Sequence, residues 1–302
     1  MPAGHGVELT EVPFFPQARY QCGPAALATA LGSSGVAVAP EDLIDDVYVP
    51  GRRGSFQFEM IAAARRHGRI PVVLDTAAAD RAGRLAALEA ELLAGRPLLV
   101  LQDYHLLWTP RWHYAVVVGF DQDREQVILR SGREQRRLES FDAFLRRWAR
   151  SDAWAVVLLK PGELPAQASA DGYLRALIDA SGRLAAADFE RSLAVALRRW
   201  PRSADLNFAA ANAARSSGDF DAARERFQKT LQLQPEHLGA LNNYADLLLA
   251  LGCVSEAQKN IDTAINLAES ASPLMAVLQA TEREVAAAAE TLEPARCAAI
   301  GR

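Results

Sequence analysis

The sequence predicts an α+β domain followed by an all-α region, and three observations support this order. The chain has 302 residues, half of them hydrophobic, which allows about two domains because single cores seldom exceed ~250–300 residues. Fifteen of the 22 aromatic residues precede residue 161, whereas 34 of the 142 residues from 161 onward are alanine, which favours helix. The Pro/Gly stretch Lys160–Pro165 lies where the composition changes. We therefore expect domains at 1–160 and 161–302.

The first 160 residues begin with helical patterns. An Ala-rich run that starts with Cys-Gly-Pro predicts a helix over Cys22–Leu31, with Pro24 in its first turn and Gly32 at its end. Two further helical patterns cover Phe56–His67 and Leu85–Ala94.

Strand patterns follow the helical ones. They cover Leu98–Gln102, His113–Phe120, Gln126–Leu129 and Ala153–Leu159. The polar segment Asp121–Glu125 predicts a hairpin between the second and third of these strands. Helices first and an antiparallel sheet afterwards is the order of an α+β domain. No glycine-rich loop follows a strand, so nucleotide binding has no support.

The second half of the chain repeats with a period of 34 residues. A shift of 34 aligns Pro201 with Pro235, Ala211 with Ala245, Gly218 with Gly252, Ala223 with Ala257, and Phe227 with Ile261. Two units run over 204–237 and 238–271, a degenerate copy covers 170–203, and 273–291 is a terminal capping helix. A generic helical bundle is the alternative, but it needs no fixed period. The segment resembles the tetratricopeptide repeat, which implies a helical solenoid that binds a substrate or a protein partner.

Charge and composition exclude several functional classes. The balance of 33 basic against 37 acidic residues gives no electrostatic footprint for nucleic acid, and no apolar run reaches the ~18 residues of a membrane span. Three cysteines are too few and too scattered for a disulfide framework or a cysteine zinc site, and no cofactor or metal motif is present. The first residues lack a signal-peptide pattern. The sequence does not distinguish between compartments: the protein is periplasmic or exported if a signal peptide has been trimmed, and cytoplasmic otherwise.

The stretch Gln17–Leu27 contains the strongest chemical signal. A cysteine in the first turn of a helix has its thiolate favoured by free N–H groups and the helix dipole, which lowers its pKa. Cys22 is therefore the candidate nucleophile, and it needs an imidazole to move the proton. Gln17, five residues earlier, can place its amide beside the thiolate and stabilise an oxyanion.

The histidine is chosen by elimination among five. His113 begins a predicted strand, which is a rigid position for a catalytic ring. His105 is expected in a loop, where a solvated or packing role is favoured.

The motifs Gln17…Cys22-Gly-Pro-Ala-Ala-Leu27 and His113-Tyr-Ala-Val-Val-Val-Gly-Phe120 resemble the two core motifs of the bacteriocin-leader-processing, papain-like cysteine peptidases. The resemblance covers roughly residues 10–160. It implies a papain-like fold and cleavage of a peptide or protein, with Cys22 as nucleophile, His113 as general base and acid, and Gln17 as the oxyanion-hole side chain. Gln21 is a second candidate for that last role.

The sequence departs from this family at one position. The family orients its histidine with an Asp on the strand after the histidine strand, and here Ser131 occupies that place. A serine accepts a hydrogen bond from the ring but does not stabilise an imidazolium as a carboxylate does. Asp121 and Asp103 are the possible substitutes. A catalytically weak or inactive peptidase-like adaptor that binds peptides or proteins is therefore the alternative function.

Overall fold

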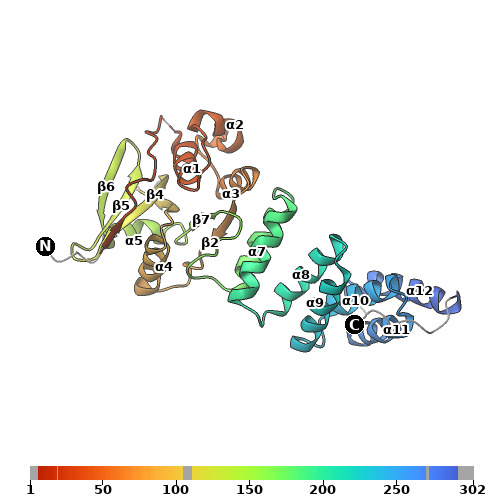
Figure 1. Cartoon of the computed structure of the whole chain (residues 1–302). Coiled ribbons are helices and arrows are strands. Elements are labelled where there is room, and N and C mark those ends of the chain that lie inside the picture. Colours follow the sequence, from red (N-terminus) through yellow and green to blue (C-terminus); the bar gives the residue numbers. More distant parts are fainter. Residues whose placement is uncertain (1–5, 19, 105–110, 270–271, 292–302) are drawn as a thin grey trace. The chain divides into compact units, whose positions relative to one another are not determined.

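The computed structural model describes residues 6–18, 20–104, 111–269 and 272–291 (Figure 1). The chain divides into two compact units, Met1–Ser192 and Leu193–Arg302. The first unit is α+β and the second is helical in its described residues, as the sequence predicts. The expected domain limits at residue 160 stay a prediction.

An antiparallel sheet forms the centre of the first unit. Its strands are β1 (Gly6–Glu8), β2 (Ile70–Val73), β3 (Leu98–Asp103), β4 (Trp112–Asp121), β5 (Gln126–Ser131), β6 (Glu134–Ser140) and β7 (Ala155–Leu159). They follow the spatial order β2-β7-β3-β4-β5-β6, and β1 pairs with the end of β4. In the register between β3 and β4, Gln102 lies opposite His113. This register places the candidate histidine at the start of a central strand.

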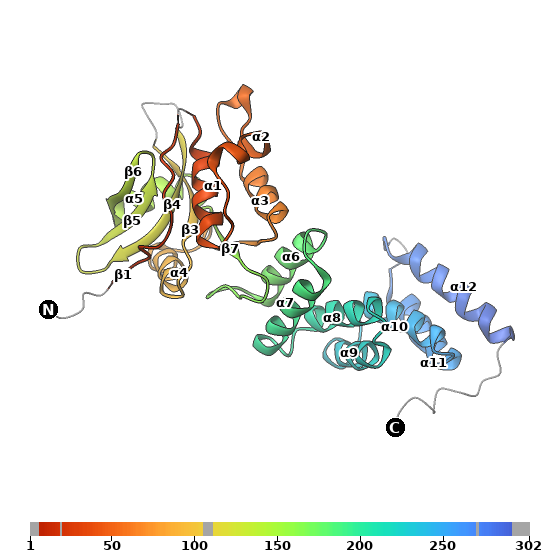
Figure 2. The ribbon, with the colours of Figure 1, turned by 45° about the horizontal axis from the view of Figure 1, so that its top comes forward.

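Helices α1 (Cys22–Ser33) and α4 (Arg81–Leu93) lie beside β4 of this sheet (Figure 2). The unit also contains α2 (Ile44–Val47), α3 (Gln57–Arg66), α5 (Phe141–Ala149), α6 (Ala170–Ser181) and α7 (Ala186–Arg199), the last of which crosses into the second unit. Short 3-10 turns cover Pro40–Leu43 and Pro50–Arg52. Helix α1 is buried along nearly its whole length and packs with Val116 and Val118 of β4 in one hydrophobic core. This packing fixes the start of α1 against the strand that carries His113.

The predicted elements of this unit are confirmed with small shifts at their ends. The expected strands correspond to β3, β4, β5 and β7, and the expected helices to α1, α3 and α4. Strands β1, β2 and β6 and helices α2 and α5 were not predicted. Strands β2 and β6 end the spatial order of the sheet, where proline and charged residues are tolerated. Because of Pro71 in β2 and the charged residues of β6, neither segment has the apolar pattern from which a strand is predicted.

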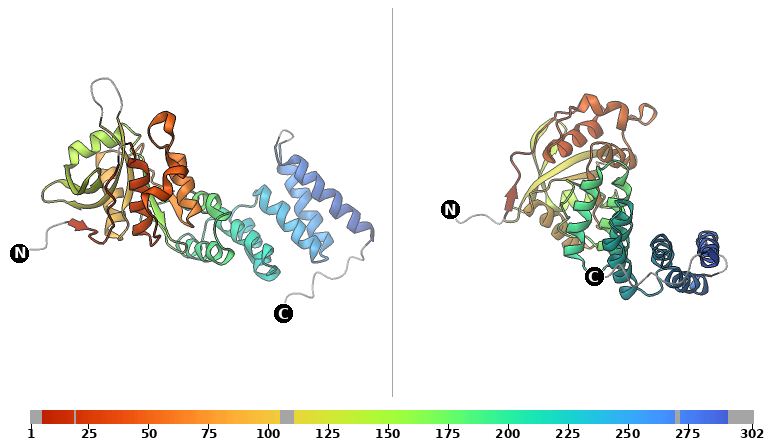
Figure 3. Two further views of the ribbon diagram at one scale, coloured as in Figure 1. Left: turned by 90° about the horizontal axis from the view of Figure 1, so that it is seen from above. Right: turned by 45° about the vertical axis from the view of Figure 1, so that its right-hand side comes forward.

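The second unit contains paired helices, visible in Figure 3. They are α8 (Ala204–Ser216), α9 (Phe220–Leu233), α10 (Leu238–Ala250), α11 (Val254–Leu267) and α12 (Met275–Thr291). Helices α8 and α10 start 34 residues apart, and so do α9 and α11. Gly218 and Gly252 follow the first helix of each pair with φ of +82° and +77°, a conformation that glycine adopts without strain.

The cysteines differ in state. Cys22 is a free thiol, whereas Cys253 takes part in a disulfide, which the scattered cysteines of the sequence did not predict.

None of the described helices is long and apolar enough to cross a membrane. Within the same described ranges, no group of three or more His, Cys, Asp or Glu side chains could hold a metal ion.

Candidate functional site

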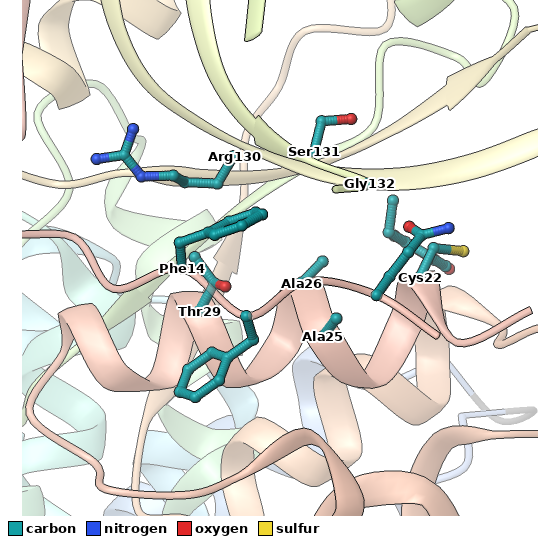
Figure 4. Close-up of a pocket in the computed structure, with 11 residues that line it drawn as sticks. Phe14, Cys22, Ala25, Ala26, Thr29, Arg130, Ser131 and Gly132 are labelled. Atoms are coloured by element: carbon teal, nitrogen blue, oxygen red, sulfur yellow. The ribbon is translucent and has the colours of Figure 1, made fainter. Parts of the chain in front are cut away.

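Cys22 is the first residue of α1 and lines a pocket between the start of this helix and β5. Gln17, Tyr114, Ser131 and Gly132 line the same pocket. Figure 4 shows the strand segment with Ser131 lying across the helix end that carries Cys22. The pocket thus brings together three of the four site residues that the sequence predicts, and the fourth, His113, precedes Tyr114.

Close packing around Gly23 explains the Cys-Gly-Pro sequence at the start of α1. A Cβ atom on Gly23 would lie 2.1 Å from Oγ of Ser55, so only glycine fits there. Pro24 occupies the first turn, where a helix needs no N–H donor. The Ser55 hydroxyl is buried and makes no hydrogen bond among the described residues. The start of α1 is therefore held by steric contact with Ser55.

The Cys22 thiol is protonated in this environment. Burial raises its pKa, while the backbone N–H groups of Tyr114, Gly23 and Cys22 itself lower it by hydrogen bonding to the sulfur. The N–H groups at the start of the helix thus lower the pKa of Cys22, as expected. The prediction of a net fall in this pKa is nevertheless wrong, because desolvation of the thiolate outweighs these donors.

His113 is held by Ser131. The ring Nε2 and the Ser131 hydroxyl are 2.8 Å apart, and this contact leaves Nδ1 for a partner on the other side of the ring. Burial, followed by the charges of Arg137 and Arg111, lowers the pKa of His113 to about 4, although Glu139 opposes this shift. The imidazole is therefore neutral at pH 7.

The two aspartates that could replace Ser131 are engaged elsewhere. Asp121 ends β4, about 25 Å along the strand from His113 at ~3.3 Å per residue, and it pairs with Arg124 in the hairpin loop at 3.1 Å. Asp103 accepts a hydrogen bond from the backbone N–H of Arg111 at 2.8 Å. Ser131 is thus the residue whose side chain the structure brings to the His113 ring.

The two glutamines also differ in position. Gln17 lines the pocket with Cys22, and its backbone N–H donates to the carbonyl of Gly132 at 2.9 Å. Gln21 is the N-cap residue of α1, where its side chain makes no capping hydrogen bond, and it does not line this pocket. The geometry therefore favours Gln17 for contact with a substrate carbonyl.

The thiol and the imidazole do not form a hydrogen bond to each other among the bonds of the described residues. The backbone N–H of Tyr114, the residue after His113, reaches the Cys22 sulfur. Both groups are neutral, so the site is a thiol and an imidazole rather than a thiolate–imidazolium pair. His105, the alternative histidine, lies outside the described residues.

A polar cluster beside His113 was not found from the sequence. The rings of Tyr104 and His113 meet edge to face, with centroids 5.4 Å apart. The Tyr104 hydroxyl donates to Glu139 at 2.7 Å, and Arg137 and Arg147 pair with the same carboxylate at 2.9 and 2.8 Å. These residues come from three segments of the chain, so no local spacing signals the cluster.

Two family models match separate parts of this chain. The model of the Peptidase_C39 like family matches residues 9–155, and that of the tetratricopeptide repeat matches residues 214–281. A crystal structure of a C39-like peptidase from Bacillus anthracis is similar at 18% identity, covering 52% of this chain and 98% of that chain, with a TM-score of 0.42. No curated protein matches the chain.

The family matches coincide with the two kinds of structure in the chain. The first spans strands β2 to β6, α1 and the positions of Cys22, His113 and Ser131, and the second spans the paired helices α9, α10 and α11. Residues 9–155 of this chain therefore form a Peptidase_C39-like domain, and tetratricopeptide repeats follow over residues 214–281.

Proposed function

We propose that this protein is a cysteine peptidase that cleaves a peptide or protein substrate, with its repeats recruiting that substrate or a partner. Cys22 attacks the carbonyl carbon, and His113 takes the thiol proton and returns it to the leaving amine. The side chain of Gln17 and the backbone N–H of Cys22 stabilise the oxyanion. A water molecule then hydrolyses the acyl-enzyme and regenerates the thiol.

The observation that carries this proposal is the placement of Cys22. The free thiol lies at the first residue of a buried helix, in a pocket shared with Gln17, and its sulfur meets the backbone N–H next to His113. The hydrogen bond between His113 Nε2 and Ser131 supports the same role, because it orients the ring and leaves Nδ1 for the thiol.

The neutral state of the site determines the mechanism. Because neither group is charged, His113 acts as a general base that removes the proton as the sulfur attacks. Ser131 gives the imidazolium formed in this step only a neutral partner, and we expect slower turnover than with an aspartate.

The same features support one alternative, a peptidase-like adaptor that binds a peptide or protein without cleaving it. Burial disfavours the thiolate of Cys22, and no hydrogen bond between described residues joins this thiol to His113. Repeat domains suit such binding because stacked helix pairs form an extended surface. The expected domains, 1–160 for the site and 161–302 for recruitment, are the same in both proposals.

Alkylation of Cys22 separates the two functions. The full chain is treated with chloroacetamide at pH 7, and the labelled peptide is identified by mass spectrometry. The control combines Cys22→Ala with Ser217→Cys and so presents one exposed thiol on the helical repeats. A peptide library is then incubated with the wild type and with Cys22→Ala.

If the protein is a peptidase, Cys22 should react with chloroacetamide faster than the introduced thiol of the control, and His113→Ala should remove this difference in rate. The wild type should also cut library peptides, and Cys22→Ala should cut none. Slow labelling of Cys22 together with no cleavage overturns the peptidase proposal and supports the adaptor.

A further inference from the structure

The hydrogen bond from His113 to Ser131 leaves the charge of the imidazolium without an anionic partner. Ser131 contacts the ring at 2.8 Å but carries no charge. During attack by the thiol, His113 becomes cationic, and a buried cation needs a compensating charge nearby. The wall of the site therefore has to supply a carboxylate from another residue.

Glu139 is a buried carboxylate in this wall. Its side chain is 3% exposed although β6, which carries it, is otherwise largely exposed. It accepts hydrogen bonds from Tyr104 at 2.7 Å and from Gln102 at 3.3 Å. Gln102 lies directly opposite His113 in the sheet, and Tyr104 meets the His113 ring edge to face. The carboxylate is thus connected to His113 by two neighbours of the ring.

Arginine side chains lie around Glu139 and Tyr104. Arg137 and Arg147 pair with Glu139 and lie over the Tyr104 ring, at 5.3 and 4.6 Å from its centroid. Arg111 precedes β4 and acts on His113 in the same sense as Arg137. Without a carboxylate here, the guanidinium groups of Arg137 and Arg111 would oppose protonation of the ring with no nearby anion to offset them. Glu139 offsets part of this charge.

We propose that Glu139, acting through Tyr104, is the positioning residue that holds the His113 ring and offsets the positive charge around it, in place of the aspartate absent at Ser131. The proposal rests on the pairing of His113 with Cys22 under the proposed function. It assigns Glu139 no contact with the substrate. Its effect is on how readily His113 accepts the thiol proton.

The direction of the electrostatic effect supports this role. Glu139 raises the pKa of His113, whereas Arg137 and Arg111 lower it. The Tyr104 hydroxyl, Arg147 and Arg137 hold the pKa of Glu139 below its ordinary value despite its burial, so Glu139 stays ionised at neutral pH. Removing its charge would leave the arginines unopposed and make proton transfer from Cys22 less favourable.

The test is the pH dependence of Cys22 alkylation in the full chain, which needs no knowledge of the substrate. In Glu139→Gln, we expect alkylation at pH 7 to fall about tenfold, since one pKa unit of His113 changes the thiolate–imidazolium population tenfold. Glu134→Gln is the matched control, because Glu134 pairs with the same Arg137 at 3.2 Å on the same strand but is 61% exposed. The control should alkylate at the wild-type rate.

A second substitution that restores the alkylation rate distinguishes loss of the Glu139 charge from loss of its packing. Ser131→Asp places a carboxylate at His113 Nε2, and in the Glu139→Gln background it should restore the alkylation rate to within threefold of wild type. If Glu139→Gln does not fold, Tyr104→Phe replaces it, because this change keeps the ring and removes only the hydroxyl that donates to Glu139. We expect Tyr104→Phe to slow alkylation severalfold.

Unchanged alkylation in a folded Glu139→Gln protein, or in Tyr104→Phe where the first variant is unfolded, overturns the proposal. A folded double variant that Ser131→Asp fails to rescue also overturns it, because a loss of packing alone would not respond to the new charge. Failure of the proposed function is recognised separately, as a wild type that cuts no peptide while its alkylation still depends on Glu139.

Discussion

Replacing Gly23 with alanine tests whether the start of α1 is set by steric contact. The added Cβ would lie 2.1 Å from Oγ and 2.7 Å from Cβ of Ser55, distances at which atoms must move. Overpacking of this kind costs about 1–3 kcal/mol, and the helix preference of alanine over glycine returns up to about 1 kcal/mol. We expect Gly23→Ala to lower the free energy of unfolding by about 1–2 kcal/mol and to displace Cys22.

Urea unfolding followed by circular dichroism measures the stability, and chloroacetamide measures the reactivity of Cys22. Gly172→Ala is the matched control, because Gly172 also lies in a first helical turn and its Cβ would meet only Ser169 Oγ, at 3.1 Å. In Gly23→Ala/Ser55→Gly both close atoms are absent, and stability should recover to within about 0.5 kcal/mol of Ser55→Gly alone. A Gly23→Ala protein as stable and as reactive as wild type would refute the steric explanation.

Three further predictions concern the site and its support. Gln17→Ala should lower kcat about 10²–10³-fold with little change in KM, as for a lost oxyanion donor, whereas Gln21→Ala should leave both steady-state constants near wild type. Because burial holds the pKa of His113 at about 4 in the folded chain against 6.5 unfolded, the unfolded chain binds the extra proton between these pH values. Stability should therefore fall by about 3 kcal/mol as pH drops from 6.5 to 4, and urea titrations of His113→Gln should lack this part of the pH dependence. Arg96→Ala leaves the fully buried Glu91 without its 2.6 Å ion-pair partner, so thermal unfolding should report a loss of about 3–5 kcal/mol; an unchanged melting temperature would contradict this.

Local patterns predicted the elements that are buried along most of their length. The run of apolar and β-branched residues in His113–Phe120 predicted β4, and the alanine run after Cys22 predicted α1, because both elements are buried in one core. Strand β6 escaped prediction because its edge position allows the sequence Glu-Gln-Arg-Arg-Leu-Glu-Ser, which has few apolar residues.

The protonation state of Cys22 could not be predicted from the residues around it in the sequence. A helix N-terminus predicts a lowered pKa, and the N–H groups of Tyr114 and Gly23 do act in that direction. The desolvation that reverses the sign comes from burial of the thiol, which shares its pocket with Gln17 from before the helix and Tyr114 of β4. Such burial depends on residues far apart in the chain, and no spacing around Cys22 encodes it.

The sequence by itself determined the two classes of structure and the 34-residue repeat, and it singled out Cys22 and His113 as candidate catalytic residues, because these depend on short-range periodicity and on motifs a few residues long. Only the tertiary structure decided that Ser131 meets His113, that Asp121 and Asp103 are engaged elsewhere, and that Glu139 lies buried beside Tyr104. These contacts depend on strand register and on the paths of separate segments. Register is set by the packing of whole faces of the sheet, so it becomes visible only when the chain has folded.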